Sequence, residues 1–189
     1  VGLYKERGEE GLWSALAYFL KAIIPVAEEE QVLMGLHPDD PSFNVRGRPR
    51  IVKDRAALKR VVDIVPSASN GITFCPGSLA TNRDNDVLAI AEQLSPHFVF
   101  CHFRNIRFLA EEELDGEWAF LETYHEDDKG AVPIPALLKL LHHKGWSGPY
   151  RADHAPGMYG HDLNFGYGLV SRAQGMSYLQ GILAGLNAA

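Results

Sequence analysis

Apolar residues follow two alternating patterns along the chain, one with helical spacing and one of short continuous runs. The first helical pattern forms a single apolar stripe: Leu12, Leu16, Phe19, Leu20, Ile23, Ile24 and Ala27. Recurrence at every third or fourth residue is typical of an amphipathic helix. Similar spacing predicts further helices over about 54–65, 84–94, 135–145 and 169–186. Pro135 suits the first turn of its helix and Gly145 suits the C-terminal cap.

Short apolar runs lie between these helices and are predicted to be buried strands over 32–36, 71–75, 98–103 and 150–153. Alternation of strand and helix indicates parallel strands joined by helical crossovers. No glycine-rich nucleotide-binding motif follows any of these runs, which disfavours a dinucleotide-binding sheet. A complete TIM barrel needs eight β/α units, so the sequence predicts an α/β fold of the (β/α)8 TIM-barrel type, of which this chain supplies about four units. We expect a single domain over 1–189, with a long acidic insertion at about 104–131.

Each predicted strand ends on a residue type that can bind a metal ion: His37, Cys75, His102 and Asp153. Because the carboxyl ends of barrel strands converge on one face, we expect these side chains to lie close together. Taken singly, each has a structural alternative, such as a hydrogen-bonded histidine or a small buried thiol. There is no Cys-x-x-Cys pair, which disfavours a closed structural zinc site and favours an open catalytic one. Cys101 precedes His102 in a strand, so it should point the opposite way and serve packing.

Composition and charge narrow the class of partner. The net charge is -6 and the basic residues are scattered, so no nucleic-acid surface is predicted. We see no apolar stretch near the ~20 residues that cross a bilayer and expect no membrane association. Two cysteines in 189 residues make a disulfide scaffold implausible and favour a reducing, cytoplasmic setting.

The strand-end segments also resemble those of the mannonate dehydratase family, in the same order: 36–41, 70–79, 102–105 and 151–154. The segment Asn-Gly-Ile-Thr-Phe-Cys at 70–75 is the most specific of them, and the match covers nearly the whole chain. The resemblance implies an eight-stranded barrel that removes water from D-mannonate to give 2-keto-3-deoxy-D-gluconate, with Mn²⁺ or Fe²⁺ as cofactor. The ligand types alone would also suit Zn²⁺, which could be bound in the purified protein.

Carried over by position, the resemblance makes His37, Cys75, His102 and Asp153 the metal ligands. It makes His154 and Tyr167 the proton-transfer pair, with the assignment of acid and base left open. Four further residues would contact the substrate: Asn70, Arg104, Asn105 and His125.

The resemblance places this chain in the C-terminal half of the family's barrel. We therefore expect a small sugar acid as substrate, and either a homo-oligomer or pairing with an N-terminal half, because half a barrel exposes two strand edges. Two other functions stay open on the sequence. One is a barrel sugar isomerase or epimerase, although a cysteine ligand is unexpected there. The other is an inactive half-barrel that binds a metal or a partner without turnover.

Overall fold

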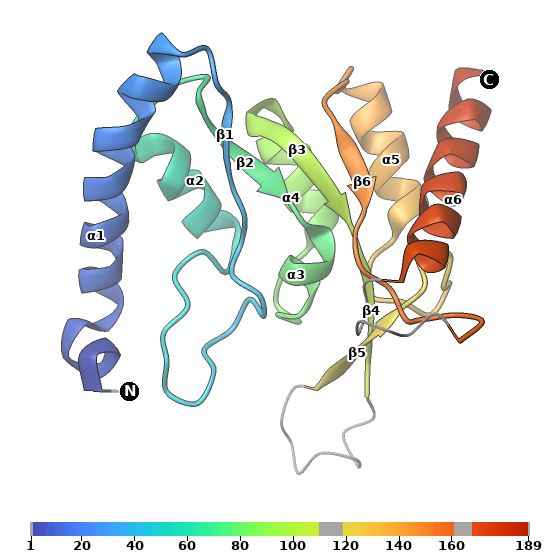
Figure 1. The fold of residues 1–189 in the computed structure, drawn as a ribbon, viewed down its shortest axis with the longest axis horizontal. Helices are drawn as coiled ribbons and strands as arrows, with labels where there is room; N and C mark the ends of the chain where they lie inside the picture. The colour runs from blue at the N-terminus through green and yellow to red at the C-terminus, as the bar shows by residue number, and fades with distance from the viewer. Residues whose placement is uncertain (1, 110–118, 161–167, 189) are drawn as a thin grey trace.

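A four-stranded parallel sheet forms the centre of the molecule (Figure 1), with the order β1-β2-β3-β6. The structure is a computed structural model and describes residues 2–109, 119–160 and 168–188, with side chains from residue 6 onward. The strands of the sheet are β1 (Met34–Leu36), β2 (Asn70–Phe74), β3 (Phe98–Phe103) and β6 (Tyr150–Ala152). Each neighbouring pair is parallel. The predicted α/β class with a parallel sheet is therefore confirmed.

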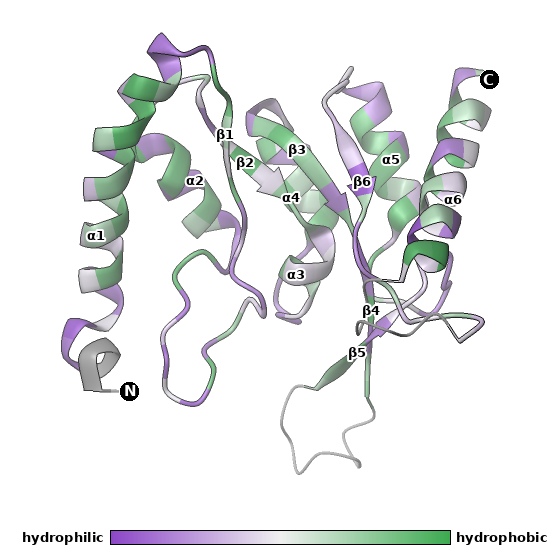
Figure 2. Cartoon of the chain, viewed as in Figure 1, coloured by the Kyte–Doolittle hydropathy of each residue, from purple (hydrophilic) through white to green (hydrophobic). Residues whose placement is uncertain are grey.

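Helices connect the strands. They are α1 (Gly2–Glu29), α2 (Arg55–Ile64), α3 (Pro76–Ala80), α4 (Val87–Leu94), α5 (Ile134–His143) and α6 (Leu169–Asn187), with a short 3-10 turn at Ser95–His97. Several helices that follow each other in the chain pack together, such as α1 with α2 and α4 with α5. The side chains of Asp54 and Asp86 cap α2 and α4 by accepting from the amides of Ala57 and Ala89, which satisfies amides that the first turn leaves unpaired. Figure 2 shows apolar residues along β2 and β3 and polar residues where β3 and β6 end.

The buried face of α1 differs in part from the predicted stripe. Leu20 and Ile24 are buried as expected, but Phe19 is 51% exposed and Trp13 is buried instead. The guanidinium of Arg60, in α2, lies 4.1 Å from the centre of the Trp13 ring, so contact with α2 covers Trp13. A stripe fixes the spacing of the apolar residues, whereas the neighbouring helix decides which of them is covered.

The expectation that no segment could cross a membrane needs a correction. By length and composition, Glu6–Glu29 is apolar enough to do so. Helices that cover a protein core pass the same test, and one side of this helix belongs to the core through Trp13, Leu20 and Ile24. Ion pairs from Glu9 to Lys53 and from Glu10 to Arg60 fasten its N-terminal part to the rest of the chain.

The predicted insertion contains a second, two-stranded sheet. Strands β4 (Asn105–Phe108) and β5 (Phe120–Thr123) pair in antiparallel fashion. The hairpin extends from the end of β3, at the edge of the sheet toward which the strands run (Figure 1). It therefore adds side chains to the same face that collects the four predicted ligands.

Candidate metal centre

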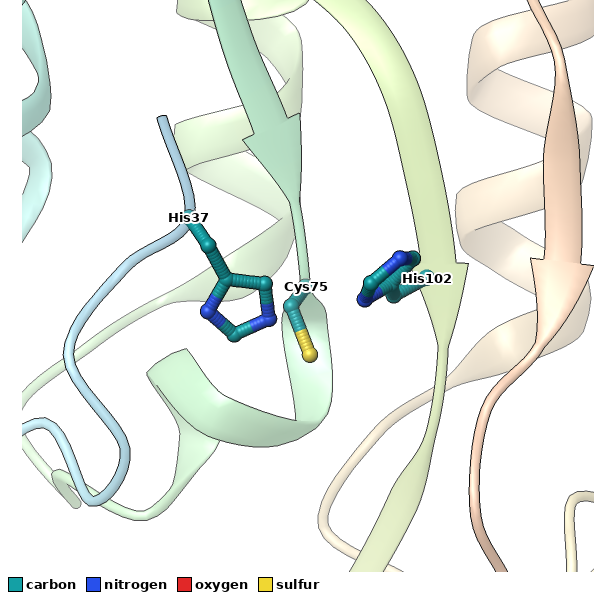
Figure 3. Close-up of side chains that lie close together, drawn as sticks. All are labelled: His37, Cys75 and His102. Atoms are coloured by element: carbon teal, nitrogen blue, oxygen red, sulfur yellow. The ribbon is translucent and has the colours of Figure 1, made fainter. Parts of the chain in front are cut away.

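Three of the predicted ligands meet at the carboxyl ends of neighbouring strands (Figure 3). One ligand atom each from His37, Cys75 and His102 lies within 4.8 Å of the other two. Three evenly spaced ligands that bind one ion at about 2.3 Å are at most about 4 Å apart. The cluster therefore fits a single cation after side-chain shifts of up to about 1 Å.

The histidine rings have a form that suits metal binding. The Nδ1 atom of His37 lies 2.6 Å from the carbonyl oxygen of Pro38, so it donates there and leaves the lone pair on Nε2. A hydrogen bond of this kind orients most histidine ligands in metalloproteins. Burial is the largest influence on His102 and, against the nearby Asp153 carboxylate, lowers its pKa to about 4. His102 is therefore neutral near pH 7 and keeps a lone pair for a cation.

Cys75 is fully buried where β2 meets α3. Burial raises the pKa of its thiol to about 11, although a contact of 3.1 Å with the Ser78 hydroxyl acts in the opposite direction. A metal ion binds the thiolate, so binding must displace this proton. Cys101 lies in the hydrophobic core instead, and burial strongly raises the pKa of its thiol. The predicted packing role of Cys101 is confirmed.

Asp153 lies beside the cluster. One of its carboxylate oxygens is 3.9 Å from Nδ1 of His102 and 3.5 Å from Nε2 of His154. Its other oxygen accepts from Arg151 at 3.0 Å. Its backbone amide donates to the carbonyl of Phe103, which fixes the end of β6 to the end of β3. Asp153 thus lies next to the three-residue cluster, which does not include it.

A buried arginine occupies the other side of the centre. Arg104 is 3% exposed and donates from Nη1 to Asp40 at 2.7 Å and to Ser78 at 3.1 Å. Its Nε and Nη2 atoms donate to the carboxylate of Glu122. Burial acts to lower the pKa of Arg104, but the two carboxylates outweigh it and raise that pKa. The cation is permanent, and its hydrogen bonds already go to protein groups.

Glu122 also contacts His154. The distance between Oε1 of Glu122 and Nδ1 of His154 is 3.1 Å. Burial acts to raise the pKa of Glu122, but the hydrogen bonds from His154 and Arg104 prevail and lower it. Neither Glu122 nor Asp40 was singled out from the sequence, although Asp40 comes three residues after the ligand His37. Only the fold brings the two carboxylates to one guanidinium.

Two predicted substrate contacts have structural roles. Asn70 begins β2, five residues before Cys75, which is about 16 Å along a strand. Its amide donates at 3.0 Å to the carbonyls of Val61 and Val65, at the end of α2. Asn105 is fully buried and binds the backbone of the segment between β5 and α5, accepting from the amide of Val132 at 3.0 Å. Both asparagines therefore have backbone partners, and their contact with a substrate stays a prediction.

His125 is also buried, and its Nε2 donates to the carbonyl of Phe103 at 2.8 Å. That carbonyl is the one that accepts from the Asp153 amide, so His125 supports the strand end that carries Asp153. Tyr167 lies outside the described residues. A cavity of about 480 Å³ on the sheet is lined in part by His37 and His102.

Comparison with known proteins agrees with this geometry. The sequence matches the family described as D-mannonate dehydratase (UxuA) over residues 1–189. It is 41% identical to a mannonate dehydratase of Enterococcus faecalis over 180 residues, which cover 95% of this chain and 49% of the relative. The crystal structure of mannonate dehydratase from Streptococcus suis superposes with a TM-score of 0.87 at 39% identity, over 95% of this chain and 50% of that one.

More distant structures share the fold alone. A xylose isomerase-like TIM barrel protein from Mycobacterium smegmatis, solved in complex with magnesium, has a TM-score of 0.66 at 14% identity. The superposed residues make up 90% of this chain and 50% of the Mycobacterium smegmatis protein. The chain therefore spans about half the length of the curated relatives and solved structures that it matches.

Proposed function

Because the chain belongs to the D-mannonate dehydratase family, we propose that it carries the metal site of an enzyme that removes water from a sugar acid. The proposed substrate is D-mannonate and the product 2-keto-3-deoxy-D-gluconate. One observation carries the proposal: His37, Cys75 and His102 offer ligand atoms within 4.8 Å of one another at the ends of three parallel strands.

Asp153 is proposed as the fourth ligand, since it lies 3.9 Å from His102. A divalent cation bound there supplies a Lewis acid that stabilises negative charge on the substrate carboxylate. Mn²⁺ or Fe²⁺ is the proposed ion, on the family resemblance. The ligand types would also accept Zn²⁺, which binds nitrogen and sulfur ligands more tightly than either.

The chemistry requires two proton transfers. The proton on the carbon next to the carboxylate is removed, and the hydroxyl on the neighbouring carbon departs as water after gaining a proton. The resulting enol then rearranges to the keto acid. His154 is proposed for one transfer, because an imidazole exchanges protons near neutral pH and its Nε2 faces the ligand Asp153 at 3.5 Å. Tyr167 is proposed for the other.

We also propose that the four β/α units form the C-terminal half of a TIM barrel, as one domain. Strands β1 and β6 are the outer strands of the described sheet, and open parallel edges invite pairing. The relatives are about twice as long as the matched segment. The further strands of the active enzyme would come from the equivalent of their other half or from a second copy of the chain. A cytoplasmic location is part of the same proposal.

A comparison of two thiol variants tests the metal site. The Cys75→Ser variant should lose most of its bound Mn²⁺ or Zn²⁺ by elemental analysis, together with formation of the keto-deoxy acid by the active polypeptide. The Cys101→Ala variant is the matched control, because this buried thiol lies in the core, and it should retain both. A Cys75→Ser variant with full metal content and activity would disprove the ligand set.

The same assay distinguishes the dehydratase from the alternative enzyme, a barrel sugar isomerase or epimerase. A sugar isomerase or epimerase would give an isomer of the substrate without loss of water. The structural neighbours of that kind support only a shared fold, at 14–17% identity. A keto-deoxy product therefore decides for the dehydratase.

A further inference from the structure

A continuous set of polar contacts connects Cys75 to His154 beside the candidate metal centre. It begins at Cys75, whose sulfur contacts the hydroxyl of Ser78, which in turn accepts from Arg104. Arg104 donates to Glu122, and Glu122 lies 3.1 Å from His154. The contacts connect a predicted metal ligand to the predicted proton-transfer histidine through one buried ion pair.

Glu122 is held firmly within this set. It lies in β5, opposite the fully buried Ile106 of β4. Both of its carboxylate oxygens accept from Nε of Arg104, at 3.0 and 3.1 Å. A carboxylate fixed by two donors on a guanidinium has a defined orientation. The oxygen that faces His154 therefore has little freedom to move.

The contact between Glu122 and His154 determines which ring nitrogen of His154 carries the hydrogen. An ionised carboxylate only accepts hydrogen bonds, so Nδ1 of His154 must carry the hydrogen in the 3.1 Å contact. The opposite ring nitrogen, Nε2, faces the Asp153 carboxylate on the side of the ligand cluster, at 3.5 Å, which is longer than the usual N–H···O hydrogen bond. A partner on one ring nitrogen is the usual way to set the tautomer and orientation of a functional histidine.

We propose that Glu122 is a positioning residue, which orients His154 so that Nε2 faces the metal side, and that Arg104 acts through Glu122 rather than by binding the substrate. The proposal rests on the dehydratase function proposed above. It revises the predicted role of Arg104: a two-pronged contact with a substrate carboxylate would need the guanidinium to leave Glu122, and a buried charge without its partner is costly.

Asp40 provides a matched control for Glu122. Both carboxylates pair with Arg104, at 2.7 Å for Asp40, and Glu122 also lies 3.1 Å from Nδ1 of His154. The variants Glu122→Met and Asp40→Leu each replace a carboxylate by an apolar side chain of similar size. Both should lower the melting temperature, because each takes a partner from a buried cation.

Only Glu122→Met should change His154. In ¹⁵N NMR spectra of the chain at one fixed pH, we expect a proton on Nδ1 of His154 in the unmodified protein and in Asp40→Leu. Glu122→Met should lose this fixed tautomer. In the active polypeptide it should also lower kcat by about 10- to 100-fold, the range typical of lost outer partners of metal-site residues, with KM and metal content nearly unchanged.

Several results would overturn the proposal. A proton confined to Nε2 of His154 in the unmodified protein would do so directly, and this measurement needs no variant to fold. Equal losses of kcat in the two variants, with the His154 tautomer kept in both, would reduce Glu122 to a structural partner of Arg104. Absence of dehydration by the unmodified polypeptide would instead refute the proposed function, while the NMR measurement would still decide the orientation of His154.

Discussion

Metal binding at this centre should release about one proton, and the proton should come from Cys75. Burial raises the pKa of the Cys75 thiol to about 11. At pH 8 the thiol is about three pH units below that value, so forming the thiolate costs about 4 kcal/mol. A cation must supply this free energy on binding. The apparent affinity should therefore rise about tenfold for each pH unit.

His102 should contribute little to this slope. Its pKa is about 4, so it is already neutral in a range of about pH 7.5 to 9.5. Within that range, the Cys75 thiol is a ligand whose proton the metal must displace.

Calorimetric titration with Zn²⁺ in two buffers of different ionisation enthalpy would count the released protons, and repetition across the pH range would give the slope. Cys101→Ala should behave like the unmodified chain. Cys75→Ser should bind more weakly, with a slope close to zero. A flat pH profile in the unmodified chain, or an unchanged slope in Cys75→Ser, would refute the role of the buried thiol.

Three predictions concern stability. Gly175→Ala should destabilise the protein by about 1–3 kcal/mol, because a Cβ there would lie 2.6 Å from Nδ1 of His125. A Cβ at Gly181, in the same helix, meets nothing within 4 Å, so Gly181→Ala should stabilise the protein by up to about 1 kcal/mol. Equal shifts of the melting temperature in the two variants would contradict the packing. Leu137→Ala should cost about 2–5 kcal/mol in urea unfolding, since this side chain is fully buried, and a cost below 1 kcal/mol would be inconsistent with that burial. Burial lowers the pKa of His125. The contribution of His125 to stability is therefore complete above about pH 6.5 and is lost as pH falls toward the pKa of His125 in the folded state. His125→Phe should show a shallower loss of unfolding free energy between about pH 6.5 and 5, and an unchanged slope would count against this.

Much of the fold follows from local pattern. The strand predicted at 98–103 has the observed bounds of β3, because a continuous apolar run ends there at the charged Arg104. The three clustered ligands were predictable for a related reason. Parallel strands in one sheet end on the same edge, so residues that follow successive strands must become neighbours. The cluster of His37, Cys75 and His102 depends on this topology alone.

The roles of the asparagines could not be predicted in that way. Asn70 and Asn105 both lie in segments that resemble the family, yet Asn70 binds backbone carbonyls at the end of α2 and Asn105 binds the backbone between β5 and α5. A side chain amide can serve a ligand or the backbone equally well, and the choice depends on which carbonyls the fold brings near. Motif position alone does not distinguish the two uses.

Burial, together with the charges of the centre, keeps the Cys75 thiol protonated. Three carboxylates of the centre, Asp40, Glu122 and Asp153, pair with two arginines, Arg104 and Arg151. A thiolate would add a further buried negative charge to a group that already has an excess, and the Asp153 carboxylate raises the pKa of Cys75 for this reason, in addition to burial. A divalent cation reverses the balance, because two positive charges offset the thiolate and Asp153 together. Arg104 is already paired with its two carboxylates, so under the proposed function the negative charge of a sugar acid would be met at the cation and not at that arginine.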